Sequence, residues 1–240
     1  HLHSLRQIMK VINKVIERIR TYGIDKSYVE AHQKHSLDHQ EEYKLVDDIV
    51  SKFRATGGLK FEHQAYKLWC LFKLLQKHQP NSIIEFGSGS SSLIFSDYVR
   101  KNDCKFLSID EDEKWALNTT KLIGIKESDN IEIKQADKVV YPNLSTIEIK
   151  YDTPITGNYD LALIDGPSLH VANTKLKEAI NSNFRNLSEL PKVILVDVRK
   201  ATAEYIAKNY SDIYDYKLSD IFTREKVKPG YQYFSVFVKK

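Results

Sequence analysis

The sequence predicts an α/β fold: a doubly wound, mostly parallel seven-stranded sheet with an antiparallel C-terminal hairpin and a helical N-terminal cap. Successive strand-like runs end in acids that lie 25 to 32 residues apart, about the length of a strand plus a crossover helix. Helix-like periodicity precedes these runs, and two more strand-like runs without an intervening helix follow them. The acids at the five strand ends are Glu85, Asp110, Asp137, Asp165 and Asp197.

The predicted helical cap covers residues 1–57. Apolar residues at three- and four-residue steps over 5–20 predict an amphipathic helix, which covers the domain or pairs with a second copy in a homo-oligomer. Binding to a membrane surface is the alternative, which the scattered basic residues disfavour. The polar stretch 21–40 is predicted to be a loop or a frayed helix with solvated histidines. His35 and His39 stand four residues apart, but no glutamate follows His35 as in a zinc-binding HExxH motif.

Further helices are expected around residues 45–53 and 65–75, and residues 58–240 are expected to form a Rossmann-like domain. From residue 81 the pattern changes to short strand-like runs separated by helix-length segments, which is typical of alternating β and α elements. The helices predicted after the strands cover residues 91–100, 113–122, 171–184 and 202–209, and the last two strands cover 214–218 and 231–238.

Composition excludes several classes of protein. Hydrophobic content of 42% and charged content of 28% are ordinary for a soluble globular chain. Because the net charge of +4 comes from well-mixed acids and bases, we expect no nucleic-acid partner. No stretch reaches the roughly 18 apolar residues of a membrane span. Cys70 and Cys104 belong to no CxxC pattern, so we expect free thiols and a cytoplasmic location.

A glycine-containing turn follows the first strand of the α/β part, in the segment Glu85-Phe-Gly-Ser-Gly-Ser-Ser-Ser92. Its glycines allow either a close approach to a ligand or simply a tight structural turn. It is not a P-loop, because the phosphate-binding lysine is missing. The Glu85 carboxylate would repel a pyrophosphate and attract a sulfonium or an ammonium group.

This acid with its GxG turn is followed in order by a second strand-end acid, a third, the strand Tyr159–Gly166 and the late hairpin. Over residues 58–240 that order resembles the class I S-adenosylmethionine (SAM)-dependent methyltransferases, whose cofactor would then be SAM. The resemblance implies that Glu85, Gly87, Ser88 and Gly89 bind the cofactor at the turn. It also implies an acid after the second strand that holds the ribose hydroxyls.

Asp110 and Glu111 compete for the ribose role. Asp110 lies 23 residues after Gly87, close to the roughly 20 expected for a ribose-binding acid in such sheets. Acids at this position are also typical of a helix N-terminus. The resemblance places Asp137 near the adenine amino group, with a turn-forming aspartate as the alternative, and Trp115 either beside the adenine or in the core.

The chemistry is expected just beyond the fourth strand, where the resemblance places the reacting methyl group. Asp165 is the first candidate for the general base or a metal ligand, and His170 is the second candidate base. A branch of the O-methyltransferases binds magnesium through acids after its fourth and fifth strands. By resemblance, Asp165 and Asp197 look like two of those ligands, although Val198 stands where another ligand is expected. The alternative to a Mg²⁺ site is a pair of polar strand ends.

The segment Asp165-Gly-Pro-Ser168 stands where family members that methylate amide or nucleobase nitrogen carry Asn-Pro-Pro-Tyr, and it is closer to the small-molecule O-methylating branch. The resemblance therefore implies SAM-dependent methyl transfer to a hydroxyl of a sugar or another small molecule. Two alternatives remain open: an NAD-dependent oxidoreductase on the same kind of sheet, and a non-catalytic, methyltransferase-like scaffold protein.

Overall fold

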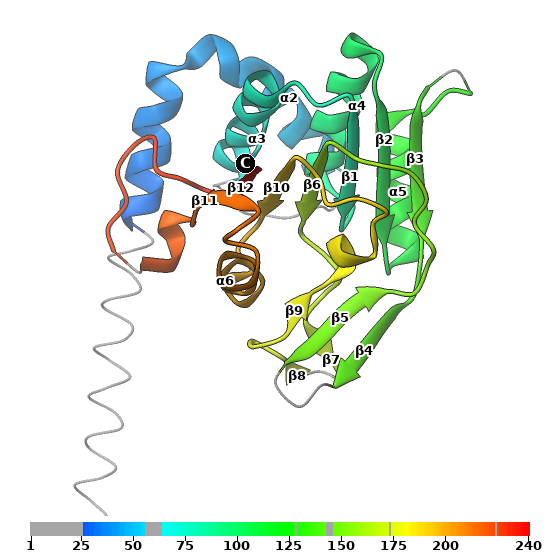
Figure 1. Cartoon of the computed structure of the whole chain (residues 1–240). Coiled ribbons are helices and arrows are strands. Elements are labelled where there is room, and N and C mark those ends of the chain that lie inside the picture. Colours follow the sequence, from blue (N-terminus) through cyan, green and yellow to red (C-terminus); the bar gives the residue numbers. More distant parts are fainter. Residues whose placement is uncertain (1–25, 56–63, 128, 143–145, 173, 224) are drawn as a thin grey trace, which may run out of the picture.

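The central sheet has seven strands in the order β11-β12-β10-β6-β1-β2-β3 (Figure 1). Strand β12 runs antiparallel to β10 and β11, and the other neighbouring strands are parallel. This confirms the predicted mostly parallel sheet with its antiparallel C-terminal strands. The strands are β1 (Ser82–Phe86), β2 (Lys105–Asp110), β3 (Ile131–Gln135), β6 (Leu161–Ile164), β10 (Val193–Val196), β11 (Tyr214–Lys217) and β12 (Ser235–Lys239). The computed structural model describes residues 26–55, 64–127, 129–142, 146–172, 174–223 and 225–240.

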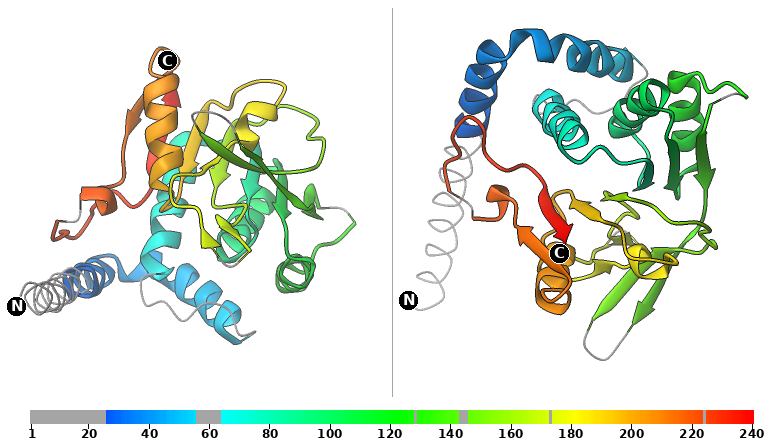
Figure 2. Two further views of the ribbon diagram at one scale, coloured as in Figure 1. Left: turned by 90° about the horizontal axis from the view of Figure 1, so that it is seen from below. Right: turned by 45° about the horizontal axis from the view of Figure 1, so that its top comes forward.

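Consecutive strand residues point to opposite faces of the sheet, and both faces are buried. In β1, Ile83 packs on one face and Ile84 on the other, and β6 repeats the alternation with Leu161 and Ala162. Helices α3 (Gln64–His78), α4 (Ser90–Asn102) and α5 (Glu113–Ile123) contribute to the first core, and α6 (Lys200–Asn209) to the second. Figures 1 and 2 accordingly show α6 on the side of the sheet opposite α3 and α4.

The helices that follow β1, β2 and β10 lie where the sequence predicts them. Helix α5 begins after Asp112, whose side chain accepts a hydrogen bond from the backbone N–H of Trp115 at 3.0 Å. It ends at Gly124, whose φ of +61° suits a residue without a Cβ. These local signals were present in the sequence, so the helix bounds agree closely.

The cap differs from the prediction in one respect: residues 26–38 form a continuous helix, not a loop. Its buried positions are Ser27, Ala31 and His35, at a spacing of four. The His35 ring stacks on His39 at 4.4 Å and meets Trp69 edge-on at 4.2 Å. The expectation that these histidines are solvated is therefore wrong for His35, whose pKa is lowered first by burial and then by His39. Histidine and alanine carry the buried stripe, so a search for aliphatic periodicity missed this helix.

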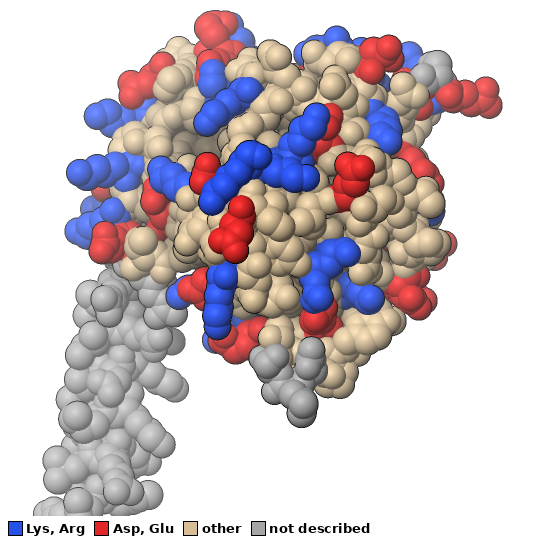
Figure 3. All heavy atoms as spheres, in the orientation of Figure 1, with Lys and Arg blue, Asp and Glu red and all other residues tan. Residues whose placement is uncertain are grey.

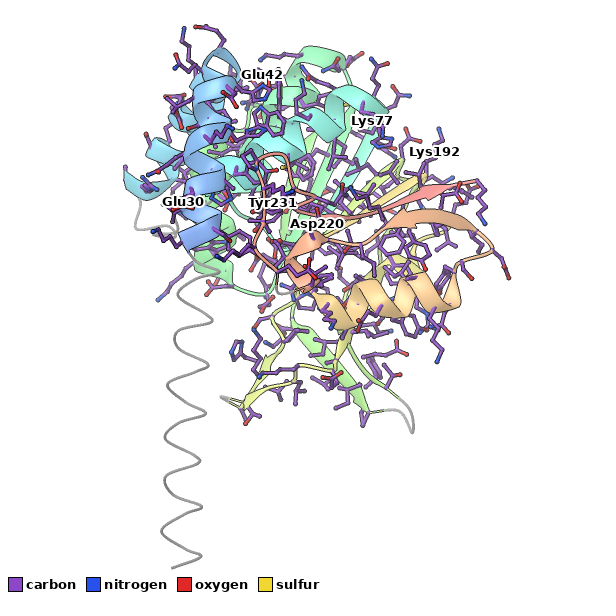
Figure 4. The ribbon with its side chains drawn as sticks, turned by 90° about the vertical axis from the view of Figure 1, so that its left-hand side faces the viewer. Glu30, Glu42, Lys77, Lys192, Asp220 and Tyr231 are labelled. Atoms are coloured by element: carbon purple, nitrogen blue, oxygen red, sulfur yellow. The ribbon has the colours of Figure 1, made fainter. Side chains whose placement is uncertain are left out.

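Aromatic contacts fasten the cap to the C-terminal part of the chain. Tyr231 precedes β12, and its carbonyl accepts a hydrogen bond from the Tyr66 hydroxyl of α3 at 2.5 Å. The hydroxyl of Tyr231, a residue labelled in Figure 4, lies 2.9 Å from His32 Nε2 of the cap helix. Helix α2 (Gln40–Ala55) packs against α3 and α4, so the cap wraps around α3 (Figure 2).

The helix predicted over 171–184 is absent. This segment instead forms β7 (His170–Val171), β8 (Thr174–Lys175), β9 (Ile180–Asn181) and the 3₁₀ turn η1 (Asn183–Asn186). Side chains of Asn181 and Asn183 bind backbone groups of Pro167 and Tyr151, a use that competes with helix formation. Strand β9 also pairs with a strand that the sequence analysis did not predict. Tertiary pairing thus overrides the local helical pattern here.

That unpredicted strand belongs to a small second sheet, visible at the bottom of Figure 1. Strands β4 (Lys138–Pro142) and β5 (Ile147–Tyr151) form an antiparallel pair, and β9 adds in parallel to β5. The strand predicted to run to Asp137 consequently ends at Gln135, and Asp137 lies at the junction with β4. A 3₁₀ turn, η2 (Asp220–Thr223), lies between β11 and β12.

Two predictions fall outside the described residues: the amphipathic helix 5–20, with its suggested role in a homo-oligomer, and the domain boundary between residues 57 and 58. None of the helices that the structure describes is long and apolar enough to cross a membrane. Acidic side chains lie among the basic ones on the face drawn in Figure 3, in keeping with the mixed charge of the sequence.

Candidate functional site

The glycine turn lies directly against the end of β6. Gly87 has a φ of +102°, and a Cβ added there would lie 2.8 Å from the carbonyl carbon and oxygen of Asp165 and 2.9 Å from the nitrogen of Gly166. The backbone N–H of Gly87 donates to the carbonyl of Ile109 at 2.8 Å. The turn therefore sits between β6 and β2, at the point of an open α/β sheet where ligands bind. Its first glycine is required by packing against the protein's own backbone.

Glu85 supports this turn from inside the protein. Its side chain is fully buried and accepts hydrogen bonds from the hydroxyls of Ser91 and Ser92, and from that of Ser108 at 2.7 Å. Burial raises its pKa to about 7, against the opposing effect of the three hydroxyls. Direct contact between Glu85 and a cofactor stays a prediction, whereas its bonds to the start of α4 explain the serines that follow the glycines.

Asp110 holds the other side of the turn. Its Oδ2 accepts a hydrogen bond from the backbone N–H of Ser88 at 2.7 Å, and its Oδ1 accepts one from the N–H of Asp112 at 2.9 Å. Burial is the main cause that raises its pKa to about 6. A carboxylate oxygen can accept more than one hydrogen bond, so the predicted bond to ribose hydroxyls is compatible with this arrangement.

The remaining turn residues are held in place as well. The Ser88 hydroxyl lies 2.9 Å from that of Ser108, and the backbone N–H of Gly89 donates to Ser92 Oγ at 2.9 Å. Trp115 Nε1 donates to the carbonyl of Ser88 at 2.6 Å, so the indole lies beside the turn. This agrees with both roles foreseen for Trp115, beside an adenine or in the core.

Glu111 and Asp137 differ in how they are held. Glu111 Oε1 accepts the backbone N–H of Ser168 at 3.0 Å, and its Oε2 accepts the hydroxyl of Tyr151 at 3.2 Å. It thereby ties the end of β2 to the segment after β6. Asp137 is exposed and accepts a hydrogen bond from Gln135 Nε2 at 3.1 Å. Their contacts to ribose or adenine stay predictions.

The two acids at the ends of β6 and β10 meet around a lysine that the sequence analysis did not select. Lys67 Nζ of α3 donates to Asp165 Oδ2 at 2.8 Å and to Asp197 Oδ2 at 2.6 Å. The side chains of Lys67 and Asp197 are 7% and 4% exposed, whereas that of Asp165 is 29% exposed. Asp165 is thus the member of this trio that a bound molecule can contact.

The charges of the trio shift one another's pKa values. Burial and the neighbouring Asp197 raise the pKa of Asp165. Burial acts in the same direction on Asp197, but the Lys67 ammonium outweighs it and lowers that pKa. Burial disfavours the charged lysine, yet the two carboxylates raise the pKa of Lys67 well above its usual value. The Lys67 side chain is therefore protonated, and Asp165 is the more basic of the two carboxylates.

Arg199 adds a second positive charge. Its Nη2 donates to the backbone carbonyl of Asp165 and lies 3.6 Å from Asp165 Oδ1. Its Nη1 donates to the carbonyl of Pro167 and to Asn181 Oδ1, both at 3.0 Å. Arg199 thereby fixes the backbone of the segment that follows β6 and begins with Asp165.

These residues do not fit the predicted Mg²⁺ site. Lys67 Nζ lies between the Oδ2 atoms of Asp165 and Asp197, so an ion that bridged these two oxygens would have to displace the ammonium. Val198, next to Asp197, contributes its backbone N–H to Asp197 Oδ1 at 2.8 Å and offers no side-chain ligand. Within the described ranges, no group of three or more His, Cys, Asp or Glu side chains is placed to hold a metal ion.

His170, the second candidate base, is exposed at the start of β7. Its Nδ1 lies 3.4 Å from the Ser168 hydroxyl, and its carbonyl accepts a hydrogen bond from Lys138 at 2.8 Å. In the part of the chain that the structure describes, no hydrogen bond joins His170 to Asp165. The structure therefore joins Asp165 and Asp197 through Lys67, whereas the described hydrogen bonds of His170 go to Ser168 and Lys138.

A signal for Lys67 was present in the sequence. It stands four residues before Leu71 and eight before Leu75, on the stripe of α3 that is buried. A lysine on an apolar stripe is rarely buried without a partner of opposite charge. Looking for that partner among the strand-end acids would have singled out Lys67.

Comparison with known proteins gives structural matches only. No family model matches the chain, and a search of curated proteins finds no match. An O-methyltransferase from Bacillus cereus, solved in complex with SAH, is 14% identical, with a TM-score of 0.51 over 81% of this chain and 90% of that one. A proposed caffeoyl-CoA O-methyltransferase from Staphylococcus aureus is also 14% identical, with a TM-score of 0.52 over 87% of this chain and 99% of that one.

At such identities the likeness concerns the fold alone. In this chain the features of that fold are the sheet order, the antiparallel β12 and the glycine turn after β1. The chain therefore has the fold of the class I S-adenosylmethionine-dependent methyltransferases.

Proposed function

We propose that the protein transfers a methyl group from SAM to a hydroxyl of a sugar or another small molecule. The observation that carries this proposal is the direct contact of the glycine turn with the backbone of Asp165 and Gly166. A cofactor held at that turn would lie beside Asp165, the more exposed of the two carboxylates that Lys67 joins. Cofactor and proton acceptor are thereby neighbours, which is what methyl transfer to a hydroxyl requires.

The reaction is an in-line displacement. The acceptor oxygen attacks the methyl carbon, a C–O bond forms, and the S–C bond breaks with its electron pair moving to sulfur. Asp165 takes the hydroxyl proton, which passes to solvent when the methyl ether leaves. The raised pKa of Asp165 favours this role, and His170 is the alternative base.

The cofactor would be held by the turn and the acids around it. Backbone groups of Gly87, Ser88 and Gly89 form the turn, which Glu85 and Asp110 hold from below. Asp110 or Glu111 would hold the ribose hydroxyls, and Asp137 the adenine. The donor set at Asp165 and Asp197 gives no support to a Mg²⁺ ion, because Lys67 lies between them.

An NAD-dependent oxidoreductase and a scaffold protein are the competing functions. The antiparallel β12 disfavours the oxidoreductase, because the two halves that bind a dinucleotide are built from parallel βαβ units. Isothermal titration with SAM and with NADH separates the methyltransferase from the oxidoreductase: we expect SAM to bind and NADH not to bind. Binding of NADH alone would refute the proposal.

Activity is tested by transfer of labelled methyl from SAM to a panel of sugars and phenols. Asp165→Asn should lower kcat by about 10²-fold or more while the Kd for SAM stays unchanged. His170→Ala is the matched variant, and we expect it to retain most of the rate. Loss of rate in His170→Ala with full rate in Asp165→Asn would transfer the role of base to His170. A protein that binds SAM but methylates no acceptor would favour the scaffold alternative.

A further inference from the structure

The position that a metal-dependent methyltransferase would give to a divalent cation is taken here by a side chain. Lys67 comes from α3, a helix that precedes the sheet in the chain, and its ammonium reaches the carboxyl ends of both β6 and β10. Its side chain is 7% exposed, so this ion pair is part of the interior and not a surface contact. A buried lysine of this kind is retained only with compensating charge.

The charges around Lys67 are already balanced. Two carboxylates, Asp165 and Asp197, face two cations, Lys67 and Arg199. A divalent ion would add two positive charges without an added ligand, because Val198 offers only its backbone. The Nζ–O distances of 2.8 and 2.6 Å are those of charge-assisted hydrogen bonds, so the ammonium is held directly between the two Oδ2 atoms.

We propose that Lys67 is a built-in replacement for a divalent cation and a positioning residue for Asp165. Its ammonium fixes Asp165 Oδ2 and is itself anchored by buried Asp197, so that the exposed part of the Asp165 carboxylate faces the acceptor. The protein therefore needs no divalent metal at this site. The metal-exclusion part stands on the geometry alone, and the part about Asp165 rests on the proposed methyl transfer.

Metal exclusion is tested by electron paramagnetic resonance titration of the protein with Mn²⁺, which needs no substrate. We expect the wild-type chain to take up no Mn²⁺ at this site, and Lys67→Met to gain one bound Mn²⁺ that the double variant Lys67→Met/Asp197→Asn loses. The proposal is overturned if the wild type binds Mn²⁺ and Asp197→Asn abolishes that binding. It is also overturned if folded Lys67→Met binds no more Mn²⁺ than the wild type.

Positioning is tested by activity and rescue. Lys67→Ala should lower kcat by about 10²-fold or more with an unchanged Kd for SAM, and added propylammonium should restore part of the rate. Lys77→Ala is the matched control on the same helix, because Lys77 is exposed at the surface (Figure 4). Wild-type protein should keep its full rate in EDTA. A rate that EDTA abolishes and Mg²⁺ restores would overturn the proposal.

The circular dichroism spectrum of each variant shows whether it is folded, and Lys67→Met keeps the aliphatic stem if Lys67→Ala unfolds. Failure of SAM to bind the wild type would sink the proposed methyl transfer but would leave the Mn²⁺ result intact. The two failures are therefore distinguishable.

Discussion

Replacing each glycine of the turn by alanine separates its structural role from its cofactor role. At Gly87 the new methyl group would lie 2.8 Å from the Asp165 carbonyl, on a backbone with a φ of +102°. The strained backbone costs about 1–3 kcal/mol, and crowding against a backbone that cannot move aside costs about 1–3 kcal/mol more. Gly87→Ala should thus lower the free energy of unfolding by about 2–6 kcal/mol, a large part of the roughly 5–15 kcal/mol typical of a domain.

Gly89→Ala is the matched variant. Its φ of 169° is ordinary extended backbone, and the nearest atom to an added Cβ is Trp115 Nε1 at 3.9 Å. We expect a change in the free energy of unfolding within about 1 kcal/mol. If the turn holds SAM through its backbone, the added methyl group should still weaken SAM binding about tenfold or more, about 1.4 kcal/mol.

Urea unfolding followed by circular dichroism gives both free energies, and isothermal titration gives the affinities. Equal stability of Gly87→Ala and Gly89→Ala, within about 0.5 kcal/mol, would refute the crowding argument. Unchanged SAM affinity in a folded Gly89→Ala protein would mean that the turn serves the fold alone.

Two further predictions concern the same turn. Burial raises the pKa of Glu85 to about 7 from its ordinary value of 4.5, so the folded state holds this proton more tightly; stability should fall as pH rises from about 4.5 to 7, by up to roughly 1.4 kcal/mol per pH unit. Urea unfolding between pH 5 and 8 should show a flatter profile for Glu85→Gln, and parallel profiles would contradict the role of burial. Trp115 lies beside the turn, so SAM should change tryptophan fluorescence in the wild type and in Trp69→Phe but not in Trp115→Phe. A signal that persists in Trp115→Phe would place the cofactor elsewhere.

The sequence by itself determined the sheet and most of its helices. Apolar runs at regular spacing, Asp112 before α5 and Gly124 after it are local features that set strands and helix ends without help from distant residues. Parallel strands also bring their carboxyl ends to one edge. The meeting of Asp165 and Asp197 could therefore be predicted from their places directly after β6 and β10.

Contacts between distant segments decided the rest. The predicted helix 171–184 gave way to β9, because pairing with β5 and the side-chain bonds of Asn181 and Asn183 outweigh local propensity. The cap helix 26–38 buries His35, whose ring meets Trp69 of α3 edge-on and whose Nδ1 lies 3.1 Å from the Tyr43 hydroxyl of α2, and the sequence pattern alone indicates neither partner.

The candidate site shows the same division. Sequence order selected the acids, but no local pattern says which oxygen each one offers. Glu85 faces inward because three hydroxyls donate hydrogen bonds to it there. Each carboxylate oxygen of Asp110 accepts a hydrogen bond from a backbone N–H group. Lys67 lies 98 residues before Asp165 and 130 before Asp197. Only the packing of α3 against the sheet, which buries that ammonium, turned a predicted pair of metal ligands into a lysine-bridged pair of carboxylates.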